Sequence, residues 1–172
     1  MITVPETVMR SADPDTDDSL CHVSWQARPG SFVSLMTLYE SNYIRLAWLV
    51  SNVETIEGKH VSVVPGDCPL HLEVEDRSRY TTTVSLTYLF DTDGGGRVAD
   101  PDLRIRIYHD ARLAEVKQCS RWHRHEVLKA LSSQARDAQQ QANLAQNLGD
   151  RWQRNMMLNK WLEYCVERGH SF

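Results

Sequence analysis

The sequence predicts an α+β fold, in which an antiparallel meander of four to five strands is flanked by an N-terminal and a C-terminal helix packed on one face. Apolar residues recur every three or four positions over 32–52 and 152–167, but every second position over much of 70–119. The strands are grouped between the helices and joined by short turns, which favours antiparallel pairing of neighbours.

Residues 1–30 are expected to form an acidic flexible tail and an irregular lead-in, followed by a single α+β domain over residues 31–172. Residues 1–20 carry five acidic side chains and one arginine, a net charge of −4 that equals the charge of the whole chain. This stretch has few large apolar residues, so it buries too little surface to offset the entropy of ordering.

The first helix is predicted over residues 32–52, with Ser31 placed to cap it. Its apolar stripe consists of Phe32, Leu35, Met36, Tyr39, Tyr43, Leu46 and Leu49. Glycine and proline then mark a loop around a short strand at 61–64.

Four further strands follow from alternation of apolar and polar residues. They are expected at 70–75, 80–90, 103–108 and 113–119, with a glycine-containing loop at 91–102. The second of these is the strongest, because it is β-branched or aromatic along most of its length.

The last part of the chain contains a Gln/Ala-rich stretch and a final helix. Residues 132–148 fit either a solvated helix or a flexible connection, and Gly149-Asp150 is expected to end that stretch. The final helix, 152–167, is expected to bury Leu158, Trp161, Leu162, Cys165 and Val166.

Length, charge and cysteine content exclude several classes of protein. The 172 residues fit one ordinary domain, and a net charge of −4 gives no global basic field to attract nucleic acid or anionic lipid. The four cysteines form no CxxC pair, and no apolar run is long enough to span a membrane. A cytoplasmic protein with reduced thiols is expected.

Several segments resemble the YqiB-like family of bacterial proteins, a family of domains of unknown function (DUF1249). The resemblance lies in residues 38–43, 79–83, 106–111, 114–116 and in Trp161-Leu162, Cys165 and Gly169 of the last helix. It implies the same α+β outline and a bacterial cytoplasmic location, and it implies no particular reaction.

The strongest local signal is a basic segment at residues 103–130, with seven basic residues against three acidic ones, a net charge of +4. Side chains on a strand alternate between faces, so Arg104, Arg106 and Tyr108 share one face. Guanidinium groups bind phosphate or carboxylate through paired hydrogen bonds. The predicted ligand-binding residues are Arg104, Arg106, Tyr108, Arg112, Arg121 and Arg124. The alternative is a solvated outer face of the sheet.

Cys119, His123 and His125 are weaker candidates for a metal site. Zinc needs three or four converging ligands, and no second cluster in the sequence completes this set. No metal and no cofactor are therefore expected.

His109, Asp110 and Glu115 are weaker candidates for proton transfer. The alternative for His109-Asp110 is a hairpin turn in which the aspartate caps the backbone. No serine or cysteine lies in a nucleophile motif, which argues against an enzyme without excluding one.

The sequence therefore favours a noncatalytic binding or regulatory module that recognises an anionic small molecule or protein partner through an arginine-rich sheet face. One alternative is an enzyme acting on a phosphorylated or nucleotide-like substrate. Another is a structural protein-interaction domain. Neither a nucleic-acid nor a membrane partner is expected, and the oligomeric state is left open.

Overall fold

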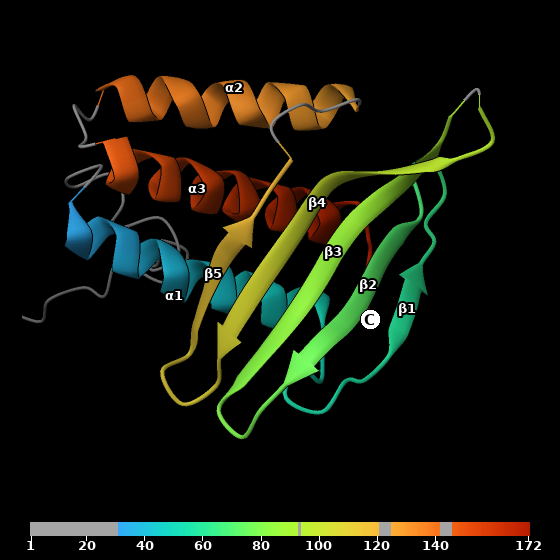
Figure 1. Ribbon diagram of the computed structural model, residues 1–172, viewed down its shortest axis with the longest axis horizontal. Coiled ribbons are helices and arrows are strands. Elements are labelled where there is room, and N and C mark those ends of the chain that lie inside the picture. The colour runs from blue at the N-terminus through green and yellow to red at the C-terminus, as the bar shows by residue number, and fades with distance from the viewer. Residues whose placement is uncertain (1–30, 93, 121–124, 142–145) are drawn as a thin grey trace, which may run out of the picture.

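The computed structural model describes residues 31–92, 94–120, 125–141 and 146–172. One five-stranded antiparallel sheet has the order β1-β2-β3-β4-β5, and the helices lie on one side of it (Figure 1). The α+β prediction is confirmed. The elements are α1 (Phe32–Leu49), β1 (Lys59–Ser62), β2 (Leu70–Arg77), β3 (Thr81–Asp91), β4 (Arg97–Tyr108), β5 (Leu113–Gln118), α2 (Glu126–Gln141) and α3 (Gln146–Glu167).

The expected tail, residues 1–30, lies outside the described residues. Within the described part of the chain, no helix is long and apolar enough to cross a membrane.

Helix α1 begins where the sequence predicts. The Ser31 hydroxyl accepts a hydrogen bond from the Ser34 N–H at 3.1 Å, which satisfies one of the free donors of the first turn. The helix ends at Leu49, because Val50 is already extended.

The β3–β4 hairpin is longer than the sequence predicts. Pairing continues to Asp91 and Arg97, so most of the expected loop at 91–102 is strand. Pro101 lies within β4 although proline lacks the N–H that a ladder needs. The structure accommodates it at a register shift between Leu86 and Tyr88, where the ladder is interrupted.

The C-terminal part contains two helices, α2 and α3, with α3 lying between α1 and α2 (Figure 1). The expected start of the last helix at residue 152 is wrong, because α3 begins at Gln146 and runs through Gly149. Glycine costs about 1 kcal/mol relative to alanine in a helix interior, which tertiary packing can offset.

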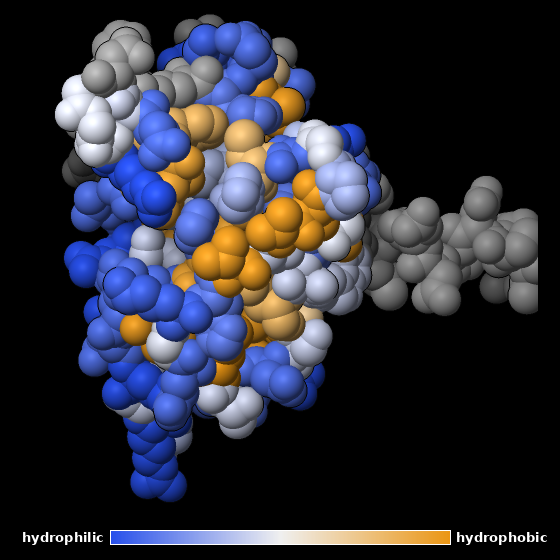
Figure 2. All heavy atoms as spheres, turned by 90° about the vertical axis from the view of Figure 1, so that its right-hand side faces the viewer, coloured by the Kyte–Doolittle hydropathy of each residue, from blue (hydrophilic) through white to orange (hydrophobic). Residues whose placement is uncertain are grey.

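The two edges of the sheet differ. Strand β1 is only four residues long, and Val61 remains 54% exposed. Figure 2 shows the side of the molecule at which β1 lies, where apolar side chains gather in the middle of a hydrophilic surround. The short length of β1 limits pairing with another strand.

The opposite edge, β5, is covered by the helices. The Val116 N–H donates to Oδ1 of Asn155 at 2.9 Å, and Nδ2 of Asn42 donates to the Ala114 carbonyl at 3.4 Å. Asn159 donates in turn to Asn42 Oδ1 at 3.0 Å. Buried asparagines of α1 and α3 thus replace the missing neighbour strand.

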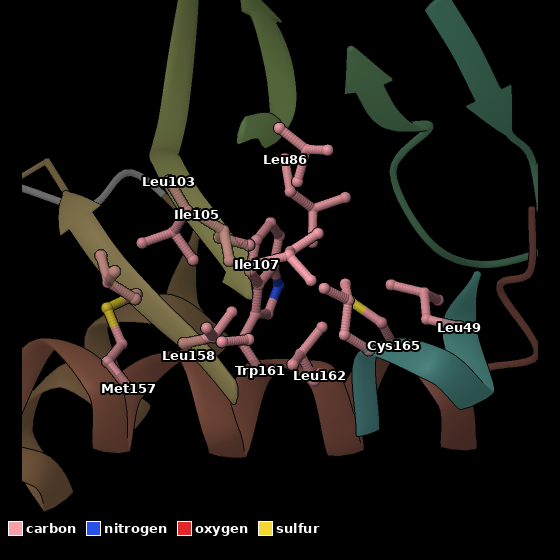
Figure 3. Close-up of a cluster of buried hydrophobic side chains, with 14 of the residues drawn as sticks. Leu49, Leu86, Leu103, Ile105, Ile107, Met157, Leu158, Trp161, Leu162 and Cys165 are labelled. Carbon is pink, nitrogen blue, oxygen red and sulfur yellow. The ribbon is translucent and has the colours of Figure 1, made fainter. Parts of the chain in front are cut away.

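The core lies between the sheet and the helices α1 and α3 (Figure 3). Side chains of β3 and β4 face α3, and Trp161 packs edge-on against Tyr88 with ring centroids 5.4 Å apart. The labelled core residues are Leu49, Leu86, Leu103, Ile105, Ile107, Met157, Leu158, Trp161, Leu162 and Cys165. This cluster fixes β4 and β5 against α3, and so positions the polar sites described next.

Candidate functional site

The arginine row of β4 lies on the sheet face that the sequence predicts. Ile105 and Ile107 are fully buried, so the alternating Arg104 and Arg106 project from the other face. Arg104 forms an ion pair with Glu75 of β2, and its side chain is 51% exposed. Its charge is therefore already compensated within the sheet.

Tyr108 belongs to a polar cluster around Glu115, the residue of β5 directly opposite Arg106. The Tyr108 hydroxyl donates to Glu115 Oε1 at 2.7 Å, and Lys117 Nζ and Arg151 Nη2 lie 2.5 and 3.2 Å from the same carboxylate. Burial raises the pKa of Glu115, but hydrogen bonds from Lys117 and Tyr108 outweigh it, so the pKa lies below its ordinary value. The pKa of Tyr108 is raised, mainly by burial and to a smaller extent by the hydrogen bond to Glu115.

Of the three other predicted ligand-binding residues, the structure describes only Arg112. Arg112 is exposed in the β4–β5 turn with a φ of +52°. Arg121 and Arg124 lie outside the described residues. The six-residue site stays a prediction, of which the structure places Arg104, Arg106 and Tyr108 on one strand.

The three proton-transfer candidates are divided between two places. Asp110 Oδ1 accepts from the Ala111 N–H at 2.9 Å, and His109 Nε2 lies 2.8 Å from Thr82 Oγ1. Within the described residues, no hydrogen bond or ion pair joins either of them to Glu115. The Asp110 contact is the turn-capping arrangement given above as the alternative.

The predicted metal candidates also separate. His123 lies outside the described residues. Cys119 Sγ lies 3.6 Å from Met157 Sδ, and burial raises the pKa of this thiol to about 12. His125 groups with Asp67 and Cys68 instead, two residues of the β1–β2 loop that sequence reasoning did not connect with it.

A polar cavity of about 610 Å³ lies between the end of β5, α2 and α3. Its lining residues are Lys117, Gln118, Cys119, Ser120, Ser132, Arg136, Asp150, Gln153, Arg154 and Met157. Met157 is buried and Cys119 half-buried, while the rest of the lining is polar. The volume lies within the range typical of small-molecule sites, about 300–1,000 Å³.

Cations dominate this cavity. Lys117, Arg136 and Arg154 line it, against one acidic residue, Asp150. Lys117 is paired with Glu115, whereas Arg136 donates to the neutral Ser133 hydroxyl at 3.2 Å. Nε of Arg154 is buried and has no hydrogen-bond partner among the described residues. A buried, unpaired guanidinium donor is costly unless an anion occupies the cavity.

Of the residues that line this cavity, only those at the end of β5, residues 117–120, belong to the basic segment 103–130 identified from the sequence. Ser132 and Arg136 are four residues apart, and Asp150, Gln153, Arg154 and Met157 follow helical spacing. This spacing could reveal the cavity only if residues 132–148 and 149–151 were taken as helical. The sequence leaves a helix open for 132–148 and predicts none for 149–151.

A family model described as protein of unknown function (DUF1249) matches residues 45–171. The uncharacterized protein YqiB of Escherichia coli strain K12 is 28% identical over 138 residues, which cover 80% of this chain and 90% of that protein. The YqiB proteins of E. coli O6:H1 and O157:H7 match with the same values. No solved structure matches.

Proposed function

The chain belongs to the DUF1249 family, whose match includes every residue lining the cavity, and we propose that it is a noncatalytic binding protein for a small anionic metabolite held there. The ligand class is the one that the sequence predicts. The site lies at the end of β5 rather than on the outer face of β4.

The single observation that carries this function is the Arg154 guanidinium, whose buried Nε has no hydrogen-bond partner among the described residues, in a cavity with two further cations. A planar guanidinium binds a phosphate or carboxylate through two parallel hydrogen bonds. Gln118, Gln153, Ser120 and Ser132 add neutral donors and acceptors for a polar ligand.

The lining favours a polar metabolite over a lipid, because Cys119 and Met157 are its main apolar surface. It also favours binding over covalent chemistry. The pKa of Cys119 is raised to about 12 by burial, so this thiol stays neutral near neutral pH and is a poor nucleophile.

Thermal-shift measurements with nucleotides, sugar phosphates and dicarboxylates test this function. A ligand at 100 times its dissociation constant stabilises the fold by about 2.7 kcal/mol. For a domain of this size, that corresponds to an increase of roughly 5–10 °C in the midpoint. If no anion in the panel raises the midpoint, the binding function is wrong.

Four arginine variants locate the site. Arg154→Gln should abolish the shift, while Arg97→Gln, an exposed arginine outside the cavity, should retain it. Arg154→Lys should bind more weakly than wild type, because lysine keeps the charge but loses the paired donors. Binding lost in Arg104→Gln but kept in Arg154→Gln would assign the ligand to the outer sheet face instead.

A further inference from the structure

Asp67, Cys68 and His125 bring three different metal-binding groups together at one side of the molecule. One carboxylate oxygen, the thiol sulfur and one ring nitrogen all lie within 4.8 Å of one another. The β1–β2 loop, the start of α2 and the end of α3 meet on this side, shown at the right in Figure 1. The anion cavity lies toward the other end of α3.

The geometry points to a zinc-binding site formed by Asp67, Cys68 and His125, with the buried His170 imidazole beside Asp67. This inference is independent of the anion-binding function.

Asp67 is held in place by the surrounding structure. Its side chain is only 2% exposed, and its Oδ1 accepts from the Cys68 N–H at 2.8 Å. The Tyr88 hydroxyl donates to Oδ2 at 3.3 Å. Gly66, with a φ of +81°, shapes the loop, and its carbonyl accepts from Arg168 Nη2 at 2.6 Å. The loop is thus fixed to β3 and to the end of α3.

Among the described residues, the ion-pair contacts that reach the Asp67 carboxylate, from Arg168 and from His170, are both long. The nearest guanidinium nitrogen, Nε of Arg168, lies 3.8 Å away, and this guanidinium also donates to the Gly66 carbonyl. A buried carboxylate is stable when a cation and hydrogen bonds neutralise it. A divalent cation between Asp67, Cys68 and His125 would supply that charge.

His170 provides the second, independent observation. Its side chain is fully buried, and Nε2 lies 3.4 Å from Asp67 Oδ2 without forming a hydrogen bond. Nδ1 lies 3.1 Å from Ser62 Oγ. When Nδ1–H donates to Ser62, the lone pair of Nε2 faces the Asp67 carboxylate, and a cation bound to that carboxylate would relieve this unfavourable contact.

His125 also has an unsatisfied ring nitrogen. Its Nδ1 is buried and has no hydrogen-bond partner among the described residues. The ring packs against Tyr88 and Phe90, with centroids 5.6 and 6.3 Å away. Figure 2 faces this side of the molecule and shows apolar side chains gathered there. An apolar surround limits water access to a metal and its ligands.

The mixed donor set selects the class of metal. Thiolate, imidazole and carboxylate together suit zinc, whereas calcium and magnesium prefer oxygen ligands alone. Ligands about 2.0–2.3 Å from a tetrahedral zinc lie roughly 3.3–3.8 Å apart. The three donors, which lie within 4.8 Å of one another, therefore need to converge by at most about 1.5 Å. Half-buried Cys68 and His125 leave a path for the ion to enter.

Cobalt(II) titration of the untagged, metal-free full-length protein tests this site. Wild type should bind about one Co²⁺ per chain, with the thiolate-to-cobalt charge-transfer band and the visible bands of tetrahedral coordination. Zinc should displace the cobalt and raise the thermal midpoint, and a chelator should reverse the increase.

Cysteine variants decide between the two candidate thiols. Cys68→Ser should lose the charge-transfer band, while Cys119→Ser, the matched control, should keep it. His125→Gln should weaken cobalt affinity at least about 100-fold, and His170→Gln should weaken it at least about 10-fold. Circular dichroism of each variant establishes that it is folded.

A folded wild type without a charge-transfer band and without stabilisation by zinc would overturn the site. So would a band that survives in Cys68→Ser, which would assign the thiolate elsewhere.

Discussion

At Glu115, burial and hydrogen bonding act on one carboxyl group in opposite directions. Its side chain is only 6% exposed, and burial alone raises the pKa. Lys117, Tyr108 and Arg151 stabilise the charged form more strongly, so the pKa in the folded protein lies below the ordinary 4.5. The folded state therefore binds this proton more weakly than the unfolded state does.

This direction predicts how stability depends on pH. The stabilisation by ionised Glu115 is fully present above the unfolded pKa of about 4.5 and is lost as the pH falls through the lower folded value. Glu115→Gln should lower the free energy of unfolding by about 1–3 kcal/mol near neutral pH. Below pH 4.5, the difference between variant and wild type should narrow, as measured by urea denaturation across a pH series.

The matched control for Glu115 is Glu73→Gln, which removes an exposed carboxylate paired with Lys59 at 3.1 Å. Such surface pairs contribute about 0–1 kcal/mol. A Glu115→Gln difference that stays constant down to acidic pH would show that the lost contribution is packing rather than charge.

Among the elements, β5 shows how side chains can replace a neighbouring strand. Asn155 accepts from the Val116 N–H and donates to the Arg151 carbonyl at 2.8 Å. Asn42 and Asn155 are fully buried. A free strand edge would otherwise be a place for pairing with another chain.

Asn155→Leu should leave the Val116 N–H without a partner and lower the free energy of unfolding by about 1–3 kcal/mol. The matched control is Asn159→Leu, which removes the buried bonds to Ser41 and Asn42 but no bond to β5. Hydrogen exchange at the Val116 amide should accelerate in the first variant and stay slow in the second. Equal protection in both would contradict the edge-capping role of Asn155.

The elements with a clear period could be predicted from sequence. Helix α1, the strand order and the burial of Ile105 and Ile107 follow from spacings of three to four and of two. Helix α2 could not be distinguished from a flexible connection, because its apolar side is narrow, with Leu128 and Ala135 buried. The start of α3 was misplaced because Gly149 resembles a helix end.

The candidate sites were harder to predict than the elements, since each is assembled from distant segments. The cavity joins the end of β5 to residues of α2 and α3, and its cations are Lys117, Arg136 and Arg154. His125 meets Asp67 and Cys68, which are 57 or more residues earlier in the chain. The spacing of residues along the sequence does not reveal these contacts, because they depend on how α2 and the β1–β2 loop pack in the folded protein.

For the whole molecule, charge is distributed unevenly along the chain. Residues 1–20 carry a net charge of −4, so residues 21–172 together are neutral. The cavity nevertheless has three cationic lining residues and one acidic one. The negative charge of residues 1–20 repels an anionic ligand and so weakens its binding at low salt. At physiological ionic strength, salt ions screen this repulsion beyond about 8 Å.

Deleting residues 1–20 should therefore strengthen binding of the anionic ligand at low salt by up to about fivefold, since exposed charges contribute at most about 1 kcal/mol. The matched control keeps the length and replaces Asp13, Asp15, Asp17 and Asp18 with asparagine, which neutralises the segment. Calorimetric titration should give the same gain for both variants, and the gain should vanish at high salt. A gain for the deletion alone, or one independent of salt, would mean that the segment acts by occupying space and not by its charge.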